Sequence, residues 1–285
     1  MKINELFATK DMVVSFEVFP PKPEAPFEPI LETITALEEL HPDFISVTYG
    51  AAGSNRGRTM DIAEHINKTN NKIISLAHLT SIVNTTQEID EILTDMKDRG
   101  IQNILALRGD PPQDTTLIAR ETFAKDLIEQ IKGHNHFGIA AAAYPEGHPE
   151  CPDKKQELAY LKAKIDAGVD FLITQIFFDN AYFYDLADKL TGLNVKTPVS
   201  AGIMPVFSAK QVERICQLCG ATIPEKLRQL MDKYADKPSD MQKAGLEYAY
   251  EQISDLVANG AHGIHLYTMN KPELATAMVK NTKLR

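Results

Sequence analysis

Cysteine is scarce in this 285-residue chain, which contains three. A small, odd number of cysteines is typical of proteins from a reducing compartment. Cys216 and Cys219 have CxxC spacing, but they lie inside the helical pattern AKQVERICQLCG, and no second Cys/His pair stands at a zinc-like spacing. We therefore expect these thiols to pack within a helix rather than to bind a metal or exchange electrons.

Long apolar runs and an excess of basic charge are also missing. The sequence has no 18 consecutive apolar residues, and its first residues, MKINELFATKD, contain no apolar segment of signal-peptide length. The formal net charge is −9 and the basic residues are scattered, which argues against nucleic acid or an anionic membrane as the main partner. We expect a cytoplasmic protein that acts on small molecules.

The chain does contain a repeated pattern of a short apolar strand, a loop and an amphipathic helix. With 44% apolar and 24% charged residues, it is typical of a soluble globular protein with a full core. Eight strands are expected, at residues 12–19, 43–49, 72–78, 101–107, 136–143, 170–177, 197–204 and 262–268.

Alternating strands and helices favour a parallel sheet. No glycine-rich GxGxxG motif follows the first strand, so eight such units predict a closed (β/α)8 TIM barrel rather than a Rossmann sheet. Residues 221–260 contain two extra helical segments before the eighth strand, which either form a subunit contact or cover the barrel. We expect one catalytic domain over residues 1–285, in a homo-oligomer.

Glu17 is conspicuous because it lies within the apolar strand MVVSFEVF. Strand side chains alternate between two faces, so Val14, Phe16 and Val18 share one face and Glu17 lies on the other. If the apolar face packs on the helices, Glu17 points into the barrel near its mouth. Removal from water favours the protonated form of a carboxylate, which suits a general acid.

Polar side chains gather where the other strands end, and active sites of such barrels lie at that end. A single histidine or Arg–Asp pair there is more often structural, but the clustering predicts a functional pocket. The residues are Thr48, Tyr49, His78, Arg108, Gly109, Asp110, Tyr144, Glu146, His148, Gln175, Tyr267 and Thr268.

Eight short motifs, in order from residue 15 to residue 271, carry a resemblance to a known family. They are SFEVFPPK, ISVTYGA, AHLT, ILALRGDPP, AAYPEGHPE, ITQIFFD, GIMPV and HLYTMNK. Together they resemble the methylenetetrahydrofolate reductases, flavin-dependent barrel enzymes of one-carbon metabolism. The chain is most similar to the short bacterial form, without the regulatory C-terminal domain of the eukaryotic enzymes.

The resemblance implies a function. It implies FAD-dependent reduction of 5,10-methylenetetrahydrofolate to 5-methyltetrahydrofolate by NADH or NADPH, which feeds methionine synthesis. Hydride passes through flavin N5 in a ping-pong sequence, and Glu17 is the general acid that opens the folate ring at N10. The sequence does not choose between the two nucleotides.

The resemblance also implies roles for individual residues. Folate is contacted by Asp110, Gln175, Gln211 and Lys271, and the nicotinamide nucleotide by Thr48 and Gln175. FAD is contacted by Tyr49, Ala51, His78, Arg108, Gly109, Asp110, Ala124, Tyr144, His148, Glu157, Tyr160 and Lys164. Glu157, Tyr160 and Lys164 are three and four residues apart, so they share one stripe of a helix. Without the resemblance, this stripe would be interpreted as a solvated helix face.

The chain departs from the family pattern at several of these positions. Glu157 stands for an aspartate and Tyr160 for an asparagine. Lys271 stands for an arginine and lacks its bidentate geometry toward a carboxylate. The other departures are Phe123 for a tyrosine, Ala163 for an arginine and Ile215 for a phenylalanine near the folate.

Other classes of barrel protein remain as alternatives. A Schiff-base aldolase needs a lysine near the end of a strand, but Lys72 starts its strand. A metal-dependent hydrolase would draw on His78, Asp110 and His148, but the first strand has no HxH pair. Another flavin-dependent barrel oxidoreductase, or a barrel that binds without catalysis, would also fit the fold.

Overall fold

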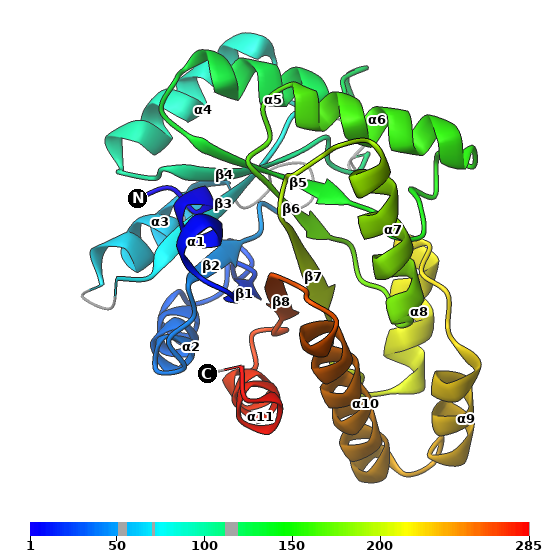
Figure 1. Ribbon diagram of the computed structural model, residues 1–285. Coiled ribbons are helices and arrows are strands. Elements are labelled where there is room, and N and C mark those ends of the chain that lie inside the picture. The colour runs from blue at the N-terminus through cyan, green and yellow to red at the C-terminus, as the bar shows by residue number, and fades with distance from the viewer. Residues whose placement is uncertain (51–55, 70–71, 112–118, 285) are drawn as a thin grey trace.

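A computed structural model describes residues 1–50, 56–69, 72–111 and 119–284, and its eight strands form a closed parallel barrel (Figure 1). Each strand pairs with the next in sequence, and β8 closes the ring against β1. The predicted (β/α)8 barrel is therefore confirmed. The strands are β1 (Val13–Val18), β2 (Phe44–Val47), β3 (Ile74–Thr80), β4 (Asn103–Leu107), β5 (Gly138–Ala143), β6 (Phe171–Thr174), β7 (Val199–Ile203) and β8 (Gly263–Tyr267).

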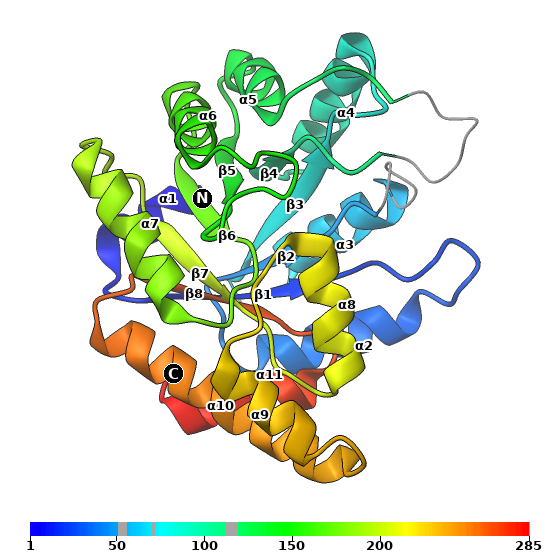
Figure 2. The same cartoon turned by 90° about the vertical axis from the view of Figure 1, so that its right-hand side faces the viewer.

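Helices surround the strands, as the view in Figure 2 shows. Their apolar stripes pack against the outward faces of the strands to form the main core. The helices are α1 (Asn4–Thr9), α2 (Glu28–Glu38), α3 (Arg56–Lys68), α4 (Thr86–Asp98), α5 (Ala124–Gly133), α6 (Lys154–Asp166), α7 (Asn180–Gly192), α8 (Ala209–Cys219), α9 (Glu225–Lys233), α10 (Pro238–Ala258) and α11 (Pro272–Thr282). Within the described residues, no helix combines the length and the apolar character needed to span a membrane.

Strand β1 confirms the expected alternation of faces. Val14, Phe16 and Val18 are fully buried in the core between strands and helices. Val13 belongs to a second apolar cluster, inside the barrel. Glu17, which shares the face of Val13, therefore points inward.

Helix α1 closes the amino-terminal end of the barrel. Ile3 and Leu6 are buried in the interior cluster together with Phe44 and Phe171. The ring of Phe7 lies 5.4 Å from that of Phe171. Because apolar side chains of the described residues fill this end, we expect a ligand to enter from the carboxyl ends of the strands.

Three helices lie between β7 and β8, and α10 is the one that belongs to the outer layer. It packs against β7 and between α7 and α11. A Cβ atom on Gly245 would lie 2.1 Å from the carbonyl oxygen of Val206, so the helix can approach this closely only without a side chain there. The two helical segments expected within residues 221–260 are confirmed, and they are α9 and α10.

Several strand ends differ from the sequence-based boundaries, and two of them bear on the site. Strand β6 ends at Thr174 rather than at residue 177, and the apolar side chains of Phe177 and Phe178 are buried in the segment that follows. Strand β3 continues to Thr80, so His78 lies inside the strand rather than at its end. An apolar run alone does not show where strand pairing stops, because buried loops are apolar too.

Candidate active site

A cavity of about 600 Å³ opens at the carboxyl ends of the strands, which is within the range of small-molecule sites. Strand ends, the segments after β4 and β5, and helix α8 form its wall. The lining includes these predicted residues: Glu17, Thr48, His78, Arg108, Gly109, Asp110, Ala124, Tyr144, His148, Lys164 and Gln175. The structure thus brings together residues from most of the strands.

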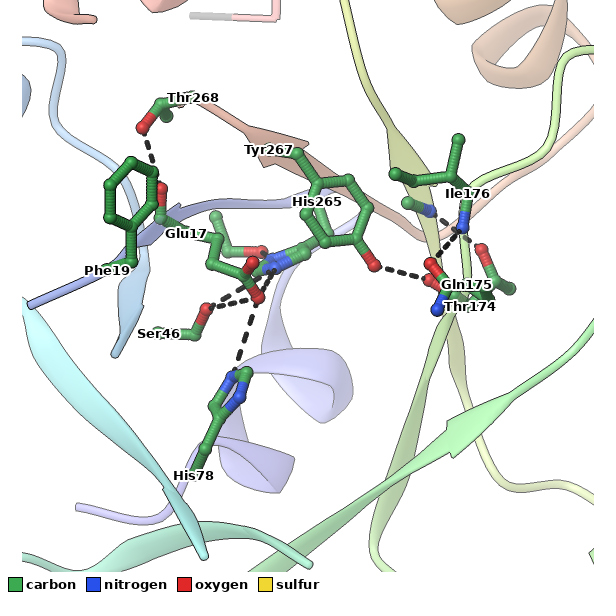
Figure 3. A network of polar contacts seen from close by, with 12 residues as sticks. Glu17, Phe19, Ser46, His78, Thr174, Gln175, Ile176, His265, Tyr267 and Thr268 are labelled. Atoms are coloured by element: carbon green, nitrogen blue, oxygen red, sulfur yellow. Dashed lines mark hydrogen bonds and ion pairs between the residues drawn. The ribbon is translucent and has the colours of Figure 1, made fainter. Parts of the chain in front are cut away.

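Glu17 lies on the inner wall of this cavity with 18% of its side chain exposed. Three polar side chains from other strands approach its Oε2 atom: Ser46 Oγ at 3.5 Å, His78 Nε2 at 3.5 Å and His265 Nε2 at 3.7 Å (Figure 3). These neighbours explain how a carboxylate is tolerated in an apolar strand, because a partly buried carboxylate needs polar partners.

His78 is a neutral neighbour of this carboxylate at neutral pH. Burial lowers the pKa of His78 to about 4, although the charge of Glu17 acts in the opposite direction. The imidazole therefore offers a dipole and one N–H group rather than a positive charge. His78 is consequently not a charged partner that would lock Glu17 in an ion pair.

His265 lies behind Glu17 and is fully buried. Its Nδ1 atom is 2.7 Å from Ser15 Oγ, and its Nε2 atom is 3.4 Å from Ser46 Oγ. The two hydroxyls fix the plane of the ring. This side chain was missed by sequence reasoning, although its strand was predicted, because nothing local to HGIHLYT shows that the histidine faces β1.

Tyr267 crosses the barrel above this group. Its hydroxyl donates to the carbonyl oxygen of Thr174, at 2.8 Å, so β8 is linked to β6 over β7. Gly202 of β7 leaves room for the ring, since a Cβ atom there would lie 2.8 Å from a ring carbon of Tyr267. Gln175 follows Thr174, and its Oε1 accepts the N–H of Ile176 at 2.8 Å, which leaves the amide N–H groups for a ligand.

Positively charged groups lie on the opposite part of the wall. Arg108 is paired with Glu150, with 2.6 Å between Nη1 and Oε2, and this hydrogen bond raises the pKa of Arg108. Lys164 reaches from α6 under the loop after β5 and donates to the carbonyl oxygen of Ala142 at 2.8 Å. Burial lowers the pKa of Lys164, and the charge of Glu157 partly opposes it. An anion in the cavity would stabilise its charged form.

Aromatic and backbone groups complete this part of the wall. The ring centroids of Tyr144 and His148 are 4.7 Å apart in an edge-on arrangement. Burial raises the pKa of Tyr144 to about 12, so its hydroxyl stays protonated. Gly109 has a φ of 89°, and a Cβ atom there would lie 2.9 Å from Thr80 Cβ, so the turn that carries Asp110 to the cavity needs glycine.

Comparison with known proteins identifies the family of this chain. The sequence model of the methylenetetrahydrofolate reductase family matches residues 2–283. The chain belongs to the methylenetetrahydrofolate reductase family. It is 34% identical over 272 residues to the 5,10-methylenetetrahydrofolate reductase of Escherichia coli K12, an alignment that covers 95% of this chain and 91% of that one.

Other relatives of this reductase family are longer. A probable methylenetetrahydrofolate reductase (NADH) from Oryza sativa subsp. japonica is 34% identical over 300 residues, which cover 99% of this chain and 50% of the rice protein. The chain thus spans about half the length of such plant relatives. Among solved structures, a Clostridium thermocellum protein that binds two copies of 5-methyl-5,6,7,8-tetrahydrofolic acid has a TM-score of 0.65 at 14% identity, over 99% and 98% of the two chains. At that identity the likeness shows the fold alone.

Some residues predicted from the family resemblance lie outside the cavity wall. Tyr49 is buried beneath it, and burial raises its pKa to about 12. Tyr160 is 50% exposed on the outer face of α6, so of the predicted stripe on that helix only Lys164 reaches the cavity. The residues outside the wall are Tyr49, Glu157, Tyr160, Gln211 and Lys271, while Ala51 lies outside the described residues.

Helix α8 contributes three wall residues, of which sequence reasoning had placed only Ile215 near the ligand. Cys216 packs in the apolar cluster beneath α8, as expected, but Cys219 faces the cavity together with Ile215 and Leu218. Burial raises the pKa of both thiols, to about 12 for Cys216, so neither is an activated nucleophile. The spacing of apolar residues along AKQVERICQLCG could have indicated that one face of this helix is buried. Met204, Tyr267 and Met269 also line the cavity.

The residues of this family member fit FAD as a cofactor. The cavity has two cationic side chains, Arg108 and Lys164, with His148 beside them, and a phosphate needs such donors. The buried amine of Lys164 carries most of this argument, because its folded environment disfavours its charge unless an anion binds. The other half of the cavity, around Glu17 and Gln175, supplies the polar groups that a pterin requires.

Proposed function

We propose that this chain reduces 5,10-methylenetetrahydrofolate to 5-methyltetrahydrofolate, with FAD as cofactor and NADH or NADPH as electron donor. The observation that carries the proposal is the position of Glu17, a partly buried carboxylate on the wall of a cavity at the barrel mouth. Family membership supplies the substrate class. NADH is the first donor to test, because the plant relatives are named as NADH enzymes.

In this proposal Glu17 is the general acid. It donates a proton to N10 of the substrate, the bond between N10 and the methylene carbon breaks, and the cation that forms at N5 accepts a hydride at the methylene carbon. One proton and one hydride are added in total. Ser46, His78 and His265 surround the carboxylate of Glu17 on three sides, at 3.5–3.7 Å.

Two further side chains act on the substrate. Asp110 lies at the cavity and its carboxylate stabilises the developing positive charge of the substrate. The amide N–H groups of Gln175 bind the pterin in one half-reaction and the nicotinamide in the other. Thr48 also contacts the nicotinamide nucleotide. When bound, FAD would supply the hydride carrier between the nicotinamide and the folate. Arg108, His148 and Lys164 would hold its phosphates, and Tyr144, His78, Gly109 and Ala124 would line its remaining surface.

The test separates the two half-reactions. Reduction of bound FAD by NADH requires no proton donated to a folate nitrogen, whereas reduction of the folate does. Glu17→Gln preserves shape but cannot donate the proton, and general acids contribute about 10²- to 10⁴-fold. We expect NADH to reduce the flavin of this variant at close to the parental rate, while methylenetetrahydrofolate reoxidises it about 10²- to 10⁴-fold more slowly.

Rapid-mixing absorbance at the flavin band measures both rates. Equal slowing of the two half-reactions would assign Glu17 a structural role. A barrel that binds without catalysis would be recognised earlier, because parental protein purified with no flavin absorbance, and unable to bind added FAD, would reject the proposal as a whole.

A further inference from the structure

The turn between β8 and α11 has an unusual backbone. Met269 and Asn270 are consecutive, and their φ angles are 55° and 53°. The left-handed region is disfavoured for residues with a Cβ atom; asparagine tolerates it better than methionine does. Two such residues in succession persist only where the surrounding structure holds them.

The side chain of Asn270 holds this turn to the end of β1. Its Oδ1 atom accepts the N–H of Phe19 at 3.0 Å, and its Nδ2 atom donates to the carbonyl oxygen of Phe19 at 2.8 Å. The regular pairing of the two strands ends with Glu17 opposite Tyr267. The amide group of Asn270 therefore extends the ladder beyond its last backbone pair.

Thr268 adds a second connection between the same two segments. It is fully buried, and its hydroxyl donates to the main-chain oxygen of Glu17 at 2.7 Å (Figure 3). The same hydroxyl oxygen accepts the N–H of Asn270 at 3.3 Å. The turn is thus bonded to β1 on both sides of Val18.

Met269 is the side chain that this arrangement presents to the cavity. It lines the wall and packs with the apolar cluster that contains Met204 and Ile215. A thioether side chain makes favourable contacts with aromatic rings. The strained turn therefore sets an apolar contact surface in the same cavity as Glu17.

We propose that Asn270 is a positioning residue for folate binding: by holding the turn to Phe19, it fixes Met269 against the ring system of the substrate. This inference rests on the proposed function, because that function supplies the ligand. The alternative is that Asn270 only stabilises the seam between β1 and β8.

The experiment uses the FAD-loaded enzyme and its product, 5-methyltetrahydrofolate, in isothermal titration calorimetry. Asn270→Gly permits the left-handed backbone but removes both bonds to Phe19, so backbone strain does not complicate the result. We expect the dissociation constant to rise about tenfold, while NADH reduces the flavin at the parental rate. Asn270→Asp still accepts the hydrogen bond from the N–H of Phe19 but cannot donate one. Its dissociation constant should lie between those of the parent and of Asn270→Gly.

The matched control is Asn194→Gly. Asn194 also has a left-handed backbone, with a φ of 55°, but it is exposed after α7 and does not line the cavity. Product binding should not change in this variant. Met269→Ala provides the second test: if Asn270 acts through Met269, the double variant should bind product no more weakly than Met269→Ala alone.

The outcomes separate the two proposals. Parental enzyme that fails to bind 5-methyltetrahydrofolate would reject the proposed function. Parental binding that Asn270→Gly leaves unchanged would reject the positioning role alone. Loss of thermal stability together with equal slowing of both half-reactions would assign Asn270 to the seam and also reject the role. Independent, additive effects of Asn270→Gly and Met269→Ala would overturn the link between them.

Discussion

At the scale of single residues, Lys164 offers a direct test of cofactor binding. If its buried ammonium group pairs with an FAD phosphate, Lys164→Ala removes a charge-assisted hydrogen bond. Such a bond contributes about 1.5–3 kcal/mol, so FAD affinity should fall about 10- to 100-fold. Fluorescence of FAD released on dilution measures this change.

Lys162→Ala is the matched control on the same helix. Lys162 pairs with Asp166 one turn away and does not line the cavity. Its loss should leave FAD affinity unchanged. Identical retention of FAD by the Lys164 and Lys162 variants would place the phosphates elsewhere.

Residue patterns predicted the position of Glu17 but not its surroundings. Period-two alternation in one strand is a local property, so it was sufficient to turn Glu17 inward. The approach of His265 depends on the closure of β8 against β1, which joins segments at opposite ends of the sequence. The same holds for Asn270 and Phe19. Contacts of this kind carry no local signal.

At the scale of elements, helix α10 shows that close packing can override the intrinsic helix propensity of a residue. Replacing glycine by alanine inside a helix usually stabilises it, by about 0.5–1 kcal/mol. At Gly245 the new Cβ atom would meet the Val206 carbonyl, so we expect Gly245→Ala to lower the free energy of unfolding by about 1–3 kcal/mol. Urea denaturation measures this.

Gly57→Ala in α3 is the control for this substitution. Among the described residues, and leaving aside the helix's own backbone and the two chain neighbours, no atom lies within 4 Å of the Cβ position at Gly57. Alanine there should therefore be neutral or stabilising by up to about 1 kcal/mol. If both variants were stabilised alike, the close contact of α10 with the segment after β7 would be wrong.

The elements themselves were largely predictable, and the exception is informative. All eight strands were expected from apolar runs, because a parallel strand is buried on both faces. The place of α8 was expected only from the family resemblance, through Gln211 and Ile215, and not from the pattern of its residues. Its amphipathic pattern shows that one face is buried, but not whether that face covers a strand or, as with Ile215 and Cys219, a cavity at the barrel mouth.

At the scale of the whole molecule, His78 links stability to pH. Its pKa is about 4 in the folded protein and about 6.5 when unfolded. Above pH 6.5 both states are neutral and the residue has no effect. As pH falls from 6.5 to 4, only the unfolded state takes up the proton, so the free energy of unfolding should decrease by about 3 kcal/mol in total; below pH 4 the loss stops.

The measurement is urea unfolding of the parent and of His78→Asn at pH 7, 6, 5 and 4, at one fixed FAD concentration. Groups that face His78, namely Glu17 and His265, are present in both proteins. Carboxylates with lowered pKa, such as Asp255, are also common to both. The difference between the two curves therefore isolates His78, and parallel curves would contradict its burial as a neutral imidazole.

The seam between β1 and β8 also has a consequence for biosynthesis. Ser15 and His265 are hydrogen-bonded but 250 positions apart in the sequence. At about 5–20 residues per second, roughly 10–50 s separate the emergence of the two from a ribosome. During that interval β1 has an open edge and the barrel interior has no wall on one side. A message truncated before codon 263 would thus yield an aggregation-prone open sheet rather than a weaker enzyme, and cofactor capture must await the last strand.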